Sequence, residues 1–130
     1  MMNVRGYIFS RSFFGERVPQ HIQNIVIRDF CKKNRLNYNL SLVEYAMKES
    51  YTMFNQIVDE IDKFDGVVLY SLFQLPESDK IRKNLCEALL KKNKKIYFAS
   101  ESRIIKSKVE LEKIDIIWKL KKKIPEKFIH

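Results

Sequence analysis

The chain has few of the residues that mark a metal centre or a disulfide framework. Its 130 residues include only two cysteines and two histidines, at scattered positions without metal-ligand spacing. Cys31 and Cys86 both fall in segments with helical periodicity, which favours buried, reduced thiols over a disulfide. We therefore expect no metal site and no cofactor.

Glycine is also scarce, with three residues in the whole chain. The loop after the first apolar segment reads SRSFFGERVP, residues 10–19, and contains a single glycine. It matches neither G-x-G-x-x-G nor a Walker sequence, whose backbone cradles a phosphate, and it lacks the G-x-S-x-G turn of hydrolases. Nucleotide binding through a standard glycine motif is therefore disfavoured.

Long apolar runs are missing as well. None approaches the ~20 residues that a membrane-spanning helix needs, and Arg5, Ser10 and Arg11 interrupt the first apolar segment, which argues against a signal peptide. We expect a cytoplasmic protein with no membrane insertion.

Positive charge, in contrast, is abundant, with a net charge of +9. Basic domains can bind nucleic acid through counterion release. Much of the excess, however, lies where helices end, and lysines there complement the helix dipole and stay solvated. This pattern favours a solvated face over an anionic small ligand or a membrane-proximal partner, and makes nucleic acid unlikely. The lysines concerned are Lys91, Lys92, Lys94, Lys95, Lys119, Lys121, Lys122 and Lys123.

Apolar runs alternate with amphipathic segments along the chain. Strands are predicted at residues 4–10, 38–45, within 65–75 and at 94–100, and helices at 19–34, 51–64, 79–93 and 107–125. This alternation predicts an α/β fold, a single doubly wound domain over residues 1–130 with a largely parallel sheet of about four strands flanked by helices. The predicted buried stripes are Ile22, Ile25, Val26 and Phe30 in the first helix and Ile81, Leu85, Ala88 and Leu89 in the third.

Ligands of open parallel sheets bind beyond the carboxyl ends of the strands. Arg11 and Arg17 could hold an anion bidentately, and Glu44, Glu101 or His21 could move protons. Each residue also has a structural interpretation as a strand end, an ion-pair partner or a surface group. The candidates are Ser10 and Arg11 after the first strand, Glu44 and Tyr45 after the second, Ser71 and Gln74 after the third, Glu101 after the fourth, and Gln20, His21, Gln23 and Asn24 at the start of the first helix.

The segments GYIFSR (6–11) and DKFDGVVLYSLFQLPES (62–78) resemble the catalytic domain of serine recombinases, the resolvases and invertases. The resemblance implies a resolvase-catalytic-domain-like fold. It places the family's first arginine at Phe9 and its nucleophilic serine at Arg11, unless the register shifts by one, and the two later arginines at Gln74 and Glu77. Since phosphoryl transfer on DNA needs these cations, the resemblance implies the fold without the recombinase activity.

The motifs RGYIFSRSFFGERVPQHIQNIVIRDFC (5–31), EYAM (44–47), DGVVLYSLFQLP (65–76) and FASE (98–101) are similar to the sporadic carbohydrate cluster protein family. These are small bacterial proteins of gene clusters for surface polysaccharides and unusual sugars. The resemblance implies a role in making a surface glycan, but no mechanism. The matching positions are Ser10, Arg11, Arg17, Pro19, Gln20, His21, Gln23, Asn24, Glu44, Tyr45, Tyr70, Ser71, Gln74 and Glu101, of which Tyr70 reads as a core residue by its position in a strand.

Three functions follow as hypotheses. The first is an enzyme or enzyme subunit of capsule, O-antigen or unusual-sugar synthesis, acting on an anionic sugar or sugar nucleotide as an isomerase, epimerase or lyase. The second is a non-catalytic module that binds a glycan precursor or a partner, and the third is a nucleic-acid-binding protein with a recombinase-like fold. Terminal apolar residues also favour a homo-oligomer, although Ile116, Ile117, Trp118 and Phe128 could equally pack on their own sheet.

Overall fold

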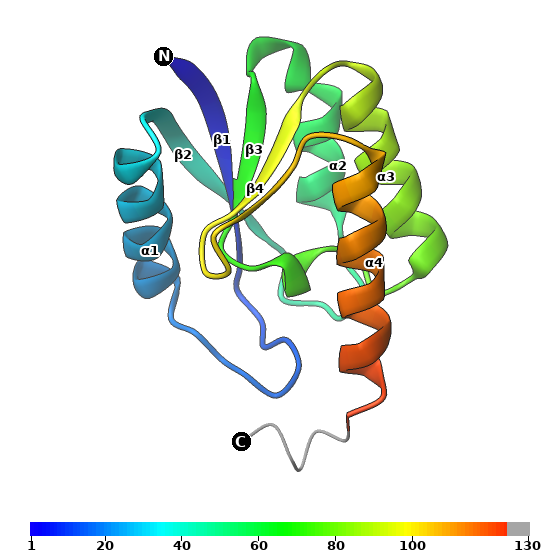
Figure 1. Ribbon diagram of the computed structural model, residues 1–130. Helices are drawn as coiled ribbons and strands as arrows, with labels where there is room; N and C mark the ends of the chain where they lie inside the picture. Colours follow the sequence, from blue (N-terminus) through cyan, green and yellow to red (C-terminus); the bar gives the residue numbers. More distant parts are fainter. Residues whose placement is uncertain (125–130) are drawn as a thin grey trace.

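The computed structural model describes residues 1–124 and forms a three-layer α/β arrangement (Figure 1). In chain order the elements are β1 (Met2–Phe9), α1 (Gln20–Lys33), β2 (Leu36–Glu44), α2 (Thr52–Asp59), the 3-10 turn η1 (Ile61–Lys63), β3 (Gly66–Leu69), the 3-10 turn η2 (Leu72–Gln74), α3 (Asp79–Lys91), β4 (Lys95–Phe98), β5 (Arg103–Ile105) and α4 (Lys108–Lys122).

The sheet has five strands in the order β2-β1-β3-β4-β5. The first four pair in parallel and β5 pairs antiparallel with β4, so the predicted largely parallel sheet is confirmed. The short strand β5 was not predicted. It follows a tight reversal in which Ser102 adopts a φ of 51°, and its three residues are too few for a period-2 pattern to stand out.

Helix α1 covers one face of the sheet, and α2, α3 and α4 cover the other (Figure 1). Neighbouring residues of β1 pack on opposite faces of the sheet, because successive side chains of a strand point in opposite directions. Tyr7 belongs to the larger core with α2, α3 and α4, while Ile8 packs with Ile27 and Phe30 of α1. Every residue of β3 is buried, as its continuous apolar run predicted.

The buried stripes of two helices differ from the prediction. Ile25 is 57% exposed and Ile81 is 50% exposed, whereas Arg82 of α3 is fully buried. The Arg82 guanidinium donates to Asp115 and Asp79 at 2.9 and 2.6 Å and lies 4.8 Å from the Trp118 ring. Because a charged residue is expected to face solvent, the sequence pattern assigned the buried position of α3 to Ile81 instead of Arg82.

Both cysteines are buried and free, as the sequence predicted. Burial raises the pKa of Cys31 to about 11 and that of Cys86 to about 12. Both thiols are therefore protonated at neutral pH and are poor nucleophiles.

Helix α4 packs against its own chain through Trp118. This side chain is fully buried, and its indole N–H donates to the Leu72 carbonyl oxygen at 3.0 Å. Ile116 remains 57% exposed, so oligomerisation stays a prediction, and Phe128 lies outside the described residues. None of the helices within residues 1–124 has both the length and the apolar character of a membrane span.

We expect Trp118→Ala to lower the free energy of unfolding by about 3–5 kcal/mol, because it removes a buried aromatic side chain and leaves a cavity. The matched change Ile116→Ala, on the exposed side of the same helix, should shift it by no more than about 0.5 kcal/mol. Urea unfolding measures both values. A large loss for Ile116→Ala, together with a lower mass in light scattering, would place Ile116 in a subunit interface instead.

Candidate functional site

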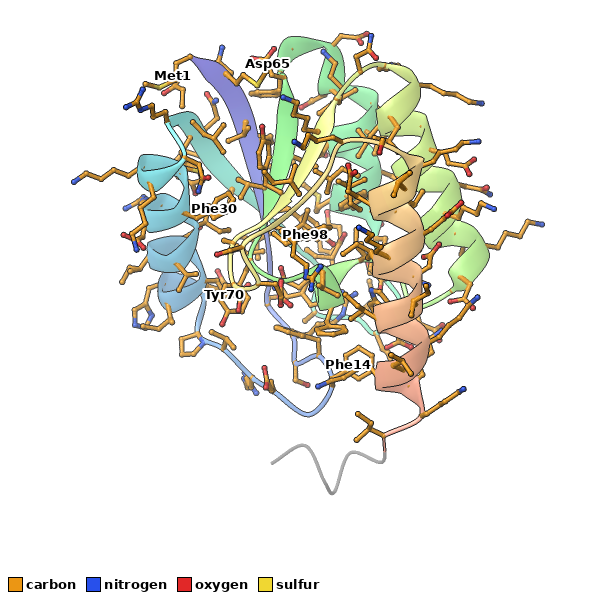
Figure 2. The ribbon with its side chains drawn as sticks, in the orientation of Figure 1. Met1, Phe14, Phe30, Asp65, Tyr70 and Phe98 are labelled. Atoms are coloured by element: carbon orange, nitrogen blue, oxygen red, sulfur yellow. The ribbon has the colours of Figure 1, made fainter. Side chains whose placement is uncertain are left out.

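The carboxyl ends of the parallel strands meet at the edge of the sheet opposite Met1 and Asp65 (Figure 2). At this edge Glu44, the last residue of β2, is 1% exposed. Its carboxylate holds the N-terminus of α2, where free N–H groups need acceptors. It accepts hydrogen bonds from the hydroxyls of Tyr7 (2.9 Å) and Ser50 (3.3 Å) and from the N–H groups of Tyr45 (3.0 Å), Met53 (3.1 Å) and Phe54 (3.2 Å).

A pair of buried amides joins β1, α1 and η2. Gln23 and Gln74 are both fully buried, and Gln74 Nε2 donates to Gln23 Oε1 at 2.8 Å. Gln23 also accepts from the Phe9 N–H and donates to the carbonyl oxygens of Phe9 and Val18. Gln74 accepts from the Ser71 N–H. These contacts satisfy the amides inside the protein and orient the loops around them.

Ser71 and Glu101 form a third polar contact at the same edge. The Ser71 hydroxyl donates to Glu101 Oε2 at 2.6 Å, and the Leu72 N–H donates to Glu101 Oε1 at 2.9 Å. Ser71 also caps η2 by accepting from the Phe73 N–H at 3.2 Å. Glu101 is half-buried, so this pair differs from Glu44 in keeping access to solvent.

Arg11 lies against two aromatic rings. Its guanidinium carbon is 4.1 Å from the centroid of Phe9 and 5.1 Å from that of Tyr51, and Nη1 donates to the Tyr45 carbonyl oxygen at 2.8 Å. Nη2 is buried and has no hydrogen-bond partner within residues 1–124. Stacking and one hydrogen bond thus fix the cation and leave one donor free.

The β1–α1 loop turns tightly at Phe14 and Gly15, which have φ values of 48° and 75°. Paired backbone hydrogen bonds between Phe13 and Glu16 close this turn. A positive φ is strained for a bulky residue. The Phe14 ring is held toward α4, 5.0 Å from Trp118 and 5.3 Å from Phe73 (Figure 2).

A cleft of about 330 Å³ opens among these loops. Its walls are aromatic, and its charged groups are two cations and two carboxylates. It is lined by Phe9, Arg11, Ser12, Phe13, Phe14, Gly15, Ala46, Lys48, Glu49, Tyr51, Phe73 and Glu77. Burial raises the pKa of Tyr51 even though Arg11 acts in the opposite direction, so the phenol is neutral at neutral pH.

A smaller cavity of about 170 Å³ adjoins the cleft. Phe13, Phe14 and Phe73 line both spaces, and Lys121 Nζ lies 5.2 Å from the Phe73 ring. The remaining groups are hydroxyls and carboxylates. They come from Glu16, Tyr70, Ser71, Ser100 and Glu101.

The structure brings only part of the predicted site together. Arg11 lines the cleft, and Tyr70, Ser71 and Glu101 line the smaller cavity. Arg17, Gln20, His21 and Tyr45 are exposed and line neither space. Asn24 bonds to Tyr38 and Ser41 of β2, and the Ser10 hydroxyl donates to the Glu44 carbonyl oxygen.

Sequence reasoning missed the residues that form most of the cleft. Phe14, Lys48, Glu49 and Tyr51 lie in loops and Phe73 lies in η2, rather than at the last positions of strands. The paired aromatics beside glycine in SRSFFG were the available signal, because strained backbone clusters at functional sites. Within residues 1–124, no three His, Cys, Asp or Glu side chains are grouped to hold a metal ion.

Solved structures share this fold. The N-terminal catalytic domain of TP901-1 integrase is 16% identical, with a TM-score of 0.66 over 91% of this chain and 96% of that one. A resolvase family site-specific recombinase from Streptococcus pneumoniae is 11% identical, with a TM-score of 0.63 over 92% of this chain and 88% of that one. No protein-family model matches the chain, and no curated protein sequence is similar to it. The predicted resolvase-like fold is confirmed.

We expect Glu44→Gln to destabilise the protein by about 1–3 kcal/mol, because the amide turns an N–H group toward donors that the carboxylate now satisfies. The control Glu112→Gln changes an exposed carboxylate of α4 and should have an effect of at most about 0.5 kcal/mol. Urea unfolding compares the two. Equal effects would contradict the capping role of Glu44.

Proposed function

We propose that the chain acts as one domain that binds an anionic sugar or sugar nucleotide in the cleft, as a cytoplasmic protein of bacterial surface-carbohydrate synthesis. The observation that carries this proposal is the Arg11 guanidinium, which is fixed by Phe9, Tyr51 and the Tyr45 carbonyl oxygen with Nη2 unpartnered in the described part of the chain. An anionic oxygen that reached Nη2 would satisfy a donor whose burial otherwise costs free energy.

The other groups of the cleft suit a sugar. Aromatic rings such as Phe73 offer apolar surface to the carbon faces of a pyranose, while Glu49 and Glu77 can accept hydrogen bonds from its hydroxyls. Lys48 adds a second positive charge, which a side chain supplies rather than the backbone of a glycine-rich phosphate loop. The volume lies at the lower end of small-molecule sites, which span ~300–1,000 Å³.

The pathway assignment depends on the resemblance to the sporadic carbohydrate cluster protein family. The motifs that carry the resemblance include SRSFFG (10–15) and EYAM (44–47), and both segments contribute residues to the cleft. This coincidence supports a common ligand class for proteins with these motifs. Capsule, O-antigen and unusual-sugar synthesis all use anionic sugars or their nucleotide conjugates.

We expect glucuronate or UDP-glucuronate to bind the protein, and Arg11→Ala to weaken that binding at least about tenfold, since charge-assisted hydrogen bonds contribute about 1.5–3 kcal/mol each. Isothermal titration calorimetry measures the dissociation constants. The control Arg28→Ala removes an equal charge from the exposed face of α1 and should leave them unchanged. Binding that survives Arg11→Ala intact would remove the cleft from the proposal.

A second candidate is catalysis on such a ligand by acid–base chemistry, as an isomerase, epimerase or lyase. The observation that favours it is the half-buried Glu101 carboxylate beside the Ser71 hydroxyl in the smaller cavity. Glu44 is committed to the N-terminus of α2, and the exposed His21 lines neither space. Glu101 is therefore the group best placed to exchange a proton with a bound sugar.

This candidate predicts exchange of a sugar carbon-bound proton for deuterium when UDP-glucuronate is incubated with the protein in heavy water. Glu101→Gln should abolish exchange, because the amide cannot take up the proton, and should bind UDP as tightly as the unchanged protein does. Mass spectrometry follows the isotope. Exchange at an undiminished rate in Glu101→Gln would exclude Glu101 as the base.

Nucleic-acid binding is the third function, and the likeness to recombinase folds favours it. Against it, the positions that the resemblance assigns to the family's arginines hold Phe9, Gln74 and Glu77. Gln74 is buried in the amide pair and Phe9 lies beneath Arg11. Tight binding of duplex DNA at low salt, where electrostatic binding is strongest, with no binding of sugar acids would overturn our proposal in favour of this one.

A further inference from the structure

A third cavity, of about 320 Å³, adjoins the opposite side of the cleft. Its lining combines apolar and aromatic side chains with two carboxylates. Ile81, which the helical pattern assigned to the core, is 50% exposed and forms part of this lining. The lining residues are Glu49, Tyr51, Pro76, Glu77, Ser78 and Ile81.

Shared residues connect the three spaces in a fixed order. Glu49, Tyr51 and Glu77 line both the cleft and the third cavity. Phe13, Phe14 and Phe73 line both the cleft and the smaller cavity. The series therefore runs from a largely apolar space with a tyrosine, through a middle with two cations and two carboxylates, to a space with hydroxyls, carboxylates and Lys121.

From this order we infer that the ligand is a nucleoside diphosphate sugar, with its base in the third cavity, its phosphates at Arg11 and Lys48 and its sugar beside Ser71 and Glu101. This inference rests on the proposed function and narrows it, since a free sugar acid would occupy the cleft alone. It also sets the direction of the ligand along the edge of the sheet.

The third cavity has the chemistry that a nucleobase needs. Tyr51 offers a ring for stacking, an interaction worth about 1–3 kcal/mol per base, and Ile81 and Pro76 add apolar surface. Glu49 and Glu77 can accept hydrogen bonds from ring N–H groups, amino groups or ribose hydroxyls. Because the Tyr51 phenol is neutral at neutral pH, it does not repel the phosphates.

The middle of the series can hold phosphates without a glycine loop. Arg11 and Lys48 form no ion pair within residues 1–124, and they share the cleft with the carboxylates of Glu49 and Glu77. Arginine holds phosphate oxygens with a planar set of donors, and lysine acts as a point charge. The scarcity of glycine in the loop is consistent with side-chain recognition of this kind.

The smaller cavity suits the sugar of the ligand. The Ser71 and Ser100 hydroxyls and the Glu101 carboxylate line this cavity and can bond sugar hydroxyls. Phe14 and Phe73 provide apolar surface. Lys121 lies over those rings and could accommodate a carboxylate on the sugar. A nucleobase would find less apolar surface here than beside Ile81.

The test titrates the full chain with glucuronate, with UDP, GDP and dTDP, and with the glucose conjugate of each diphosphate. We expect at least one diphosphate to bind, and Ile81→Glu and Tyr51→Leu each to weaken it about tenfold or more, within the range expected for a lost base contact. Ile81→Glu should leave glucuronate binding unchanged, whereas Tyr51→Leu also removes a ring that positions Arg11. Val109→Glu, which changes an equally exposed apolar residue of α4, is the control for Ile81→Glu.

The glucose conjugate should bind more tightly than its diphosphate, and Glu101→Gln should remove that gain. Because Tyr51 packs on the core and its replacement could unfold the protein, the surface change Ile81→Glu decides the position of the base. Glucuronate binding without any diphosphate binding would overturn the inference and leave the proposed function standing. No binding of any probe would overturn both, and diphosphate binding insensitive to Ile81→Glu would overturn the placement.

Discussion

The hydrogen bond between the buried amides of Gln23 and Gln74 is the contact on which the carboxyl edge of the sheet depends. Gln23 binds both backbone polar groups of Phe9, and Gln74 holds the N–H group of Ser71. One contact therefore joins the end of β1, the first turn of α1 and the loop after β3. A buried polar pair stabilises the protein only when all its groups are satisfied. The loops that supply those partners are therefore held in one arrangement.

This constraint explains why several of the polar residues predicted at the strand ends form hydrogen bonds within the protein. A parallel sheet brings several loops to one edge, and their backbone groups need partners whether or not a ligand binds there. Glu44 and the two glutamines supply those partners and are buried in doing so. Side chains such as Arg11 and Tyr51, which lie above this polar layer, are then the ones exposed to a ligand. The same topology thus brings these residues to one edge but does not decide which of them line the cleft.

The sequence predicted the parallel strands and the four helices, because each depends on local periodicity. It misplaced part of the buried faces of α1 and α3, because each includes a polar residue, Gln23 or Arg82, whose partner is distant in sequence. It also missed the cleft walls. Phe14 and Phe73 are 59 positions apart in the numbering and meet only because the strained turn at Gly15 brings them together, and no local pattern encodes such a meeting.

Two proteins can share a fold and differ in their sites, because fold and site depend on different residues. The chain shares the arrangement of strands and helices with recombinase domains, whereas its cleft is lined mainly by loop side chains, and function depends on the residues of a site rather than on the fold. Arg11 stacks on Phe9, at the position where the resemblance would place a catalytic arginine. A cation therefore lies at this edge, against two aromatic rings and beside a small cleft.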